Sequence, residues 1–252
     1  MQDIYIGDHG KGIPLVLVHG FLGSAEMWAP QIDFFKDYFR IITPDIPGFG
    51  KSNKVKSCDN IQSMAHTLLD CLERKKVNKF YLLGHSMGGM ISQEMAKIKG
   101  SKILKLICYS TGSLGAMPGR FETLEKSRKN LKKIGLEATA KNIAETWFVK
   151  GSRAKYFDIC IESGKQCSME AADNALLAFK KWNGFKTLKK IKNKTLIIWG
   201  DKDKSYTLDQ IKILKNNIKD SKLIIFKNCA HNIHLEEFDK FNQTVKGFLL
   251  RD

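Results

Sequence analysis

Short apolar runs rich in β-branched residues recur along the chain, and longer stretches with helical spacing separate them. The runs have the length and composition of buried strands, and they cover residues 13–18, 40–44, 80–83, 103–109, 195–199 and 223–226. The helical stretches cover residues 25–39, 61–72, 87–98 and 208–218. This alternation predicts an α/β fold in which a mostly parallel sheet carries helices on both faces.

The alternation stops between residues 112 and 188, where only helical patterns occur. These patterns cover residues 121–134, 136–149 and 169–182. A chain of 252 residues is the usual size of one large α/β domain with an insertion. We therefore expect a core made of residues 1–111 and 189–252, interrupted by a helical insertion at residues 112–188.

The most informative local motif is G-H-S-M-G-G at residues 84–89, between a predicted strand and a predicted helix. A sharp strand-to-helix turn exposes the hydroxyl of the residue at its apex, and it requires small neighbours such as Gly84 and Gly88. The start of a helix also favours a developing negative charge. A glycine-rich turn with an incidental serine is the alternative, but the flanking elements favour Ser86 as a nucleophile.

A serine hydroxyl needs a base close to it, and the base needs a group that orients it. Asp201 and Asp203 follow the strand predicted at 195–199, and His231 follows the next strand. Since ligands bind beyond the carboxyl ends of parallel strands, we expect one of these carboxylates and the histidine to be neighbours. Taken singly, each of these residues would more often cap a turn or face solvent. Their position relative to Ser86 predicts an acid and a base.

H-G-F-L-G at residues 19–23 also follows a strand. Acyl transfer needs two N–H donors for the oxyanion, and a loop of this kind supplies one of them. We expect these donors to be the backbone amides of Phe21 and Met87. His19 itself need not touch the substrate.

The net charge of +16 arises from 36 lysines and 6 arginines that are spread along the chain without a long block. No recognition motif accompanies this charge, so we expect a solvated lysine surface and no nucleic-acid partner. The surface could also steer an acidic carrier or an anionic substrate. No apolar run is long enough to span a membrane, and residues 1–10 lack a secretory signal. With six cysteines and no C-x-x-C pair, we expect free thiols and a cytoplasmic location.

In the order serine, acid, histidine, the chain resembles the α/β-hydrolase superfamily over nearly its whole length. D-I-P-G-F-G-K-S at residues 45–52 resembles the family's D-x-P-G-x-G-x-S loop, and W-G-D-K-D at residues 199–203 resembles its W-G-x-x-D loop. The resemblance implies that Asp203 orients His231. The family's G-H-x-x-x-x-E pattern is present with Ala230 in place of the glycine and with Glu236 at its end.

Within the superfamily, S-M-G-G-M-I at residues 86–91 is similar to the elbow of 3-oxoadipate enol-lactonases and of small bacterial carboxylesterases. Residues 19–28 are similar to carboxylesterases that act on pimeloyl-carrier methyl esters. Serine at position 86 disfavours the members that use a nucleophilic aspartate. The resemblance implies that residues 112–188 form the family's helical cap, which sets the substrate.

We therefore expect a serine hydrolase, of carboxylesterase or lactonase type, that cleaves a small ester or lactone through an acyl-enzyme on Ser86. The resemblance implies no metal and no organic cofactor. One alternative is a carbon–carbon bond hydrolase with the same triad, whose pocket would need polar groups for an extra carboxylate. The other is a receptor that senses a small molecule on the same fold and turns it over slowly.

Overall fold

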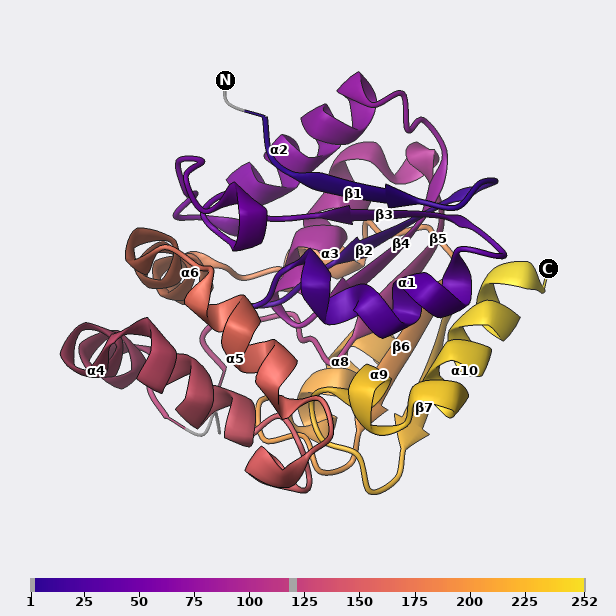
Figure 1. Cartoon of the computed structure of the whole chain (residues 1–252). Helices are drawn as coiled ribbons and strands as arrows, with labels where there is room; N and C mark the ends of the chain where they lie inside the picture. Colours follow the sequence, from indigo (N-terminus) through magenta and orange to yellow (C-terminus); the bar gives the residue numbers. More distant parts are fainter. Residues whose placement is uncertain (1–2, 118–121, 252) are drawn as a thin grey trace.

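A seven-stranded sheet runs through the centre of the computed structural model, which describes residues 3–117 and 122–251 (Figure 1). The strands are β1 (Ile6–His9), β2 (Pro14–Val18), β3 (Arg40–Pro44), β4 (Phe80–His85), β5 (Ile103–Tyr109), β6 (Thr195–Gly200) and β7 (Ser221–Phe226). Their order across the sheet is β1-β3-β2-β4-β5-β6-β7, and every neighbouring pair is parallel except β1 and β3. The predicted α/β fold with a mostly parallel sheet is confirmed.

The first strand, β1, is absent from the sequence-based prediction. It pairs antiparallel with β3, with Ile6 opposite Pro44, and it forms one edge of the sheet. Its sequence is I-G-D-H, and Asp8 and His9 are exposed. An edge strand that faces solvent needs no apolar run, so the pattern that identifies buried strands does not detect it.

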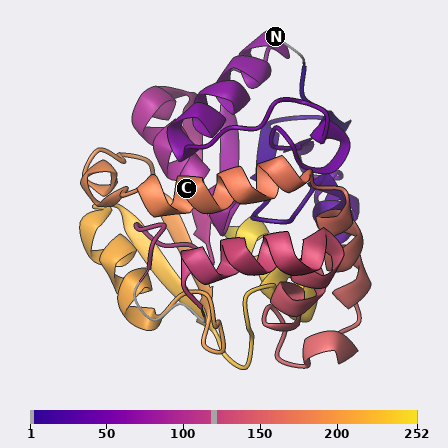
Figure 2. The same cartoon turned by 90° about the vertical axis from the view of Figure 1, so that its left-hand side faces the viewer.

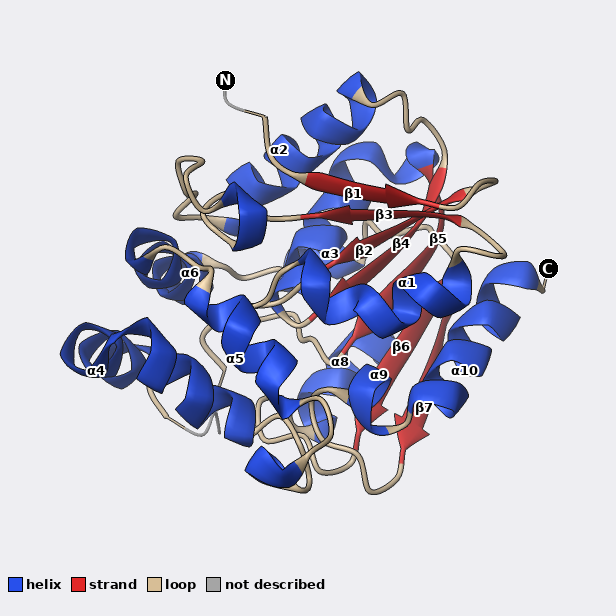
Figure 3. Cartoon of the chain, viewed as in Figure 1, coloured by secondary structure: helices blue, strands red, loops and turns tan. Residues whose placement is uncertain are grey.

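Helices cover both faces of the sheet (Figure 3). On one face lie α1 (Ala29–Phe35) and α10 (Phe238–Leu250), and on the other lie α2 (Ile61–Arg74), α3 (Met87–Lys99) and α8 (Leu208–Asn217). The helix predicted at residues 25–39 is shorter than expected, because residues 25–28 form a 3₁₀ turn before α1 begins. Helix α10 is not among the predicted elements.

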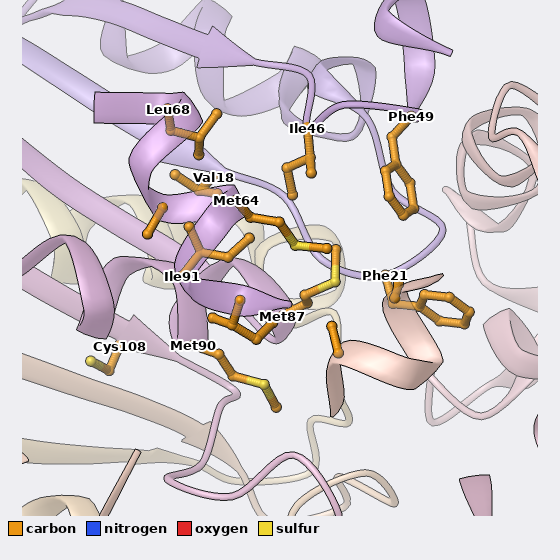
Figure 4. Close-up of a cluster of buried hydrophobic side chains, with 14 of the residues drawn as sticks. Val18, Phe21, Ile46, Phe49, Met64, Leu68, Met87, Met90, Ile91 and Cys108 are labelled. Atoms are coloured by element: carbon orange, nitrogen blue, oxygen red, sulfur yellow. The ribbon is translucent and has the colours of Figure 1, made fainter. Parts of the chain in front are cut away.

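The side chains of β2 alternate between the two faces of the sheet. Leu15 and Leu17 belong to the apolar cluster under α1 and α10, whereas Val16 and Val18 belong to the cluster under α2 and α3. Figure 4 shows the second cluster, in which side chains from α2 and α3 meet around the end of β2. Both faces of the strand are therefore buried, as its continuous apolar sequence predicts.

Residues 122–182 form helices beside the carboxyl ends of the strands (Figures 1 and 2). They are α4 (Leu124–Glu145), α5 (Phe157–Lys165) and α6 (Met169–Lys181), and α4 and α6 run side by side (Figure 2). Helix α4 is broken at Gly135, whose φ of 80° favours glycine, so the predicted division between residues 134 and 136 is present. The predicted start at Phe121 lies outside the described residues.

Helix α5 is not predicted, because its nine residues include a glycine and several polar side chains. Two shorter helices are α7 (Phe185–Leu188), which precedes β6, and α9 (Ile233–Glu236), which precedes α10. Over the ranges 3–117 and 122–251, no helix is both long and apolar enough to cross a bilayer. All six cysteines are free thiols.

Candidate active site

Ser86 stands at the turn between β4 and α3, with φ 55° and ψ −117°. This backbone conformation is rare for a residue with a side chain, and neighbouring groups must hold it. The Ser86 amide donates to the Tyr109 carbonyl at 2.9 Å, and the Thr111 hydroxyl donates to the Ser86 carbonyl at 2.8 Å. Two hydrogen bonds from the neighbouring strand and its loop thus fix the turn.

The glycines on both sides of Ser86 allow the backbone to pass closely through this turn. A Cβ atom on Gly84 would lie 2.2 Å from the Gly88 carbonyl oxygen, and one on Gly88 would lie 2.2 Å from the Val18 carbonyl oxygen. Both contacts are far inside van der Waals distance. Any larger residue at either position would displace the strand-to-helix turn. The motif therefore requires glycine at both positions for steric reasons.

His231 and Asp203 meet above the ends of β6 and β7. The His231 Nδ1 atom lies 2.9 Å from the Asp203 Oδ2 atom, and both side chains are buried. The other oxygen, Oδ1, accepts the Ser205 amide at 2.7 Å. Since a carboxylate can only accept, His231 Nδ1 carries the proton in the neutral imidazole, which leaves Nε2 as the basic nitrogen.

Asp201 points to a different partner. Its Oδ1 atom accepts the Asn228 amide at 2.7 Å, and its Oδ2 atom lies 3.8 Å from the Lys227 ammonium group. These contacts tie the loop after β6 to the loop after β7 at the surface. The structure therefore brings Asp203 to His231, whereas Asp201 binds the turn that follows β7.

A buried aromatic cluster supports the backbone of His231. The Tyr109 hydroxyl donates to the His231 carbonyl at 3.0 Å, and the His85 ring contacts the same carbonyl through Nε2 at 3.2 Å. Burial holds the pKa of His85 well below its ordinary value, and burial together with the nearby His231 lowers the pKa of His234 to about 3. Both supporting histidines are therefore neutral at pH 7. No local motif in the sequence indicates their role or that of Tyr109.

A small cavity of about 40 Å³ lies between Ser86, His231 and the insertion. The Tyr206 ring, which also lines it, stacks on the His231 ring with centroids 5.8 Å apart and planes within 8°. No lysine, arginine, aspartate or glutamate lines the cavity in the part of the chain that the structure describes. The remaining lining is mainly apolar: Phe21, Met90, Met117, Ile143, Trp147 and Phe179.

Of the two predicted amide donors, Phe21 lines this cavity and Met87 directly follows Ser86. Met87 is the first residue of α3, so no carbonyl of a preceding helical turn is available to its N–H group. Its side chain points into the buried cluster in Figure 4, and the neighbouring Phe21 ring points away toward Phe179, at a centroid distance of 5.8 Å. The Met87 side chain is thus engaged in core packing, and the Phe21 ring packs on Phe179 at the wall of the cavity.

His19 and Asp45 hold the loops next to the site. His19 Nε2 accepts the Ile46 amide at 3.0 Å, and burial lowers the pKa of His19. Asp45 accepts the Ala25 amide at 2.6 Å and the Lys51 amide at 2.7 Å. Neither residue lines the cavity. Among the described residues, no group of three His, Cys, Asp or Glu side chains is placed to hold a metal ion.

Comparison with known proteins agrees with this architecture. The model of the alpha/beta hydrolase fold family matches residues 13–238. A pimeloyl-[acyl-carrier protein] methyl ester esterase from Legionella pneumophila is 28% identical, in an alignment that covers 98% of this chain and 100% of the relative. A 2-hydroxy-6-oxononadienedioate/2-hydroxy-6-oxononatrienedioate hydrolase from Comamonas testosteroni is 28% identical over 98% of this chain and 91% of the relative.

Among solved structures, the enol-lactonase from Burkholderia xenovorans superimposes with a TM-score of 0.87. The alignment covers 98% of this chain and 96% of the lactonase, with 20% sequence identity, so the likeness is one of fold. The resemblance to enol-lactonases and bacterial esterases that the motifs predicted is confirmed.

Proposed function

This chain belongs to the α/β-hydrolase family, and on that premise we propose that it is a serine hydrolase that cleaves a small carboxylic ester or lactone. One observation carries the proposal. Ser86 stands in a strained turn at the end of β4 and lines the same cavity as His231. The Nδ1 atom of His231 is hydrogen-bonded to the buried carboxylate of Asp203. A nucleophile, a base and an orienting acid are the groups that acyl transfer needs.

In the proposed reaction, the Ser86 hydroxyl attacks the carbonyl carbon while His231 Nε2 takes its proton. The imidazolium then gives that proton to the leaving alkoxide, and water repeats the sequence to release the acid. Asp203 stabilises the imidazolium, and by binding Nδ1 it leaves Nε2 of His231 available for the proton transfer. The amides of Phe21 and Met87 bind the oxyanion, and the start of α3 adds favourable partial charge.

The cavity supports an uncharged acyl group as the substrate. Its described lining is mainly apolar and includes no lysine, arginine, aspartate or glutamate, so an unpaired carboxylate would be costly to bury there. This lining argues against the carbon–carbon bond hydrolase alternative, which would need polar groups for a second carboxylate. A volume of about 40 Å³ also favours a short acyl chain.

We further propose that residues 112–188 are a cap and that residues 1–111 and 189–252 are the catalytic core. Ile143, Trp147 and Phe179 come from the insertion and line the cavity opposite Ser86. The acyl group would therefore be selected mainly by the cap.

The six free thiols support the proposed cytoplasmic location.

A panel of p-nitrophenyl esters of increasing acyl length, with simple lactones beside them, tests the proposal. We expect rapid turnover of acetate and butyrate esters and a steep fall toward octanoate. A fluorophosphonate should label Ser86 stoichiometrically and abolish turnover. Slow turnover of every ester, together with a rise in melting temperature on addition of a small ligand, would instead indicate the receptor alternative.

A further inference from the structure

A short segment of the insertion, residues 147–149, contacts the histidine loop, and we call this segment the strap. The Trp147 carbonyl accepts the His231 amide at 3.1 Å and the Asn232 amide at 3.0 Å. The Trp147 ring lies 6.0 Å from the His231 ring, centroid to centroid, and both line the cavity. The strap therefore binds the backbone of the proposed base and also forms part of the wall that faces the substrate.

Glu236, at the end of α9, binds both sides of this contact. Its Oε1 atom accepts the Val149 amide at 2.6 Å, and its Oε2 atom accepts the Ala230 amide at 2.6 Å. One carboxylate thus joins the strap to the residue that precedes His231. With the two bonds to Trp147, the amides of three consecutive residues, 230 to 232, are all fixed by the strap or by Glu236.

Glu236 is partly buried, and burial raises the pKa of its carboxyl group while the two amides oppose that shift. A buried carboxylate is normally retained only where donors satisfy its oxygens, and here each oxygen has one backbone donor. A glutamine of the same shape could accept only one of these bonds. Its amide group would face the second N–H group, donor against donor.

We propose that Glu236 is a positioning residue, which sets the place of His231 relative to Ser86 by tying the histidine loop to the cap. The inference rests on the proposed function, because it assigns Glu236 a role in the same reaction. The strap thus connects the cavity-lining residues of the insertion to the loop that carries His231. A displacement of about 1 Å at such a base can cost on the order of 10²-fold in rate.

The test compares Glu236→Gln with Glu237→Gln, which removes the same charge from an exposed side chain one residue later. Active sites are first titrated with a fluorophosphonate, and kcat and KM for p-nitrophenyl acetate are then given per labelled site. We expect Glu236→Gln to lower kcat per site by about 10- to 100-fold with KM nearly unchanged. Glu237→Gln should stay within about twofold of wild type, as surface changes usually do.

A purely structural role for Glu236 would lower the melting temperature and the number of labelled sites, but not the rate per site. That result would overturn the proposal, and so would equal losses in both variants. If Glu236→Gln does not fold, Glu236→Asp takes the same test, because it keeps the charge but is one methylene too short to reach both amides. Failure of wild type to label at Ser86 would refute the proposed function itself, which is a distinguishable outcome.

Discussion

Two regions meet at the cavity, and different interactions hold them. The floor consists of Ser86, His231 and Asp203, which backbone strain and short hydrogen bonds fix in direction as well as in place. The wall from the insertion consists of apolar side chains such as Ile143 and Phe179, which packing holds without a preferred direction. Directional bonds suit groups that must transfer a proton, whereas packing allows the shape of a wall to vary at little cost.

The largest effect that this comparison predicts is at the floor. Ser86→Ala should lower kcat by on the order of 10⁶, because only the oxyanion donors and binding would remain. Its melting temperature should stay close to that of wild type, since the change removes one hydroxyl that faces the cavity. Ester hydrolysis and fluorophosphonate labelling measure the loss, and labelling of the variant at the wild-type rate would place the nucleophile elsewhere.

The two neighbouring carboxylates of the loop after β6 should differ sharply. Asp203→Asn should lower kcat by on the order of 10⁴, because the imidazole loses its orienting acceptor and the support for its cation. Asp201→Asn should cost less than about tenfold, since Asp201 binds a surface turn. Kinetics of both variants, with melting curves to verify folding, separate them. A larger loss for Asp201→Asn in a folded protein would show that the acid is misassigned.

A change in the wall should alter selectivity more than rate. Trp147 lines the cavity, so Trp147→Ala should shift the ratio of kcat/KM between octanoate and acetate esters by about tenfold or more toward the longer chain. Phe148 is the matched control, because it packs on Phe157 at a centroid distance of 6.3 Å and does not line the cavity. Phe148→Ala should lower stability by about 3 to 5 kcal/mol and leave the ratio unchanged.

Trp147 and Phe148 are adjacent aromatic residues, and the sequence alone gives no reason to expect different effects from their replacement. Equal shifts in the ratio for Trp147→Ala and Phe148→Ala would mean that the cap acts as a whole rather than through the residues that line the cavity. No shift in either would place acyl selection in the core.

The smallest effect concerns the histidines that support the floor. The pKa of His234 is about 3 in the folded protein, so the unfolded chain binds its proton first as pH falls below about 6.5. Stability should therefore decrease from pH 6.5 toward pH 3, by up to about 1.4 kcal/mol per pH unit from this residue. Urea unfolding at pH 7, 6 and 5 should show a shallower decrease for His234→Asn than for wild type. His9→Gln, an exposed control, should follow wild type, and equal slopes in all three proteins would contradict the assignment.

The periodicity of apolar residues determines most of the α/β core of this protein. Six of the seven strands are predicted within a few residues, because each of them carries an apolar run, including β7, which is an edge strand and only partly buried. The edge strand β1 is missed because it is short and its Asp8 and His9 face solvent, and helices α5 and α10 are not predicted either. The motif around Ser86 predicts its strained turn because the glycines are needed sterically wherever a strand turns so sharply into a helix.

Only the tertiary structure decides which groups meet. The spacing of residues along the loop after β6 leaves Asp201 and Asp203 as alternatives, between which only the resemblance to the family's W-G-x-x-D loop chooses. In the structure, the chain turns Asp203 toward His231 and Asp201 toward Asn228. The same holds for Glu236, Tyr109 and Trp147, which come from three separate elements and converge on the histidine loop. Local sequence specifies the conformation of each segment, but contacts between distant segments depend on how the elements pack, and no local pattern encodes that packing.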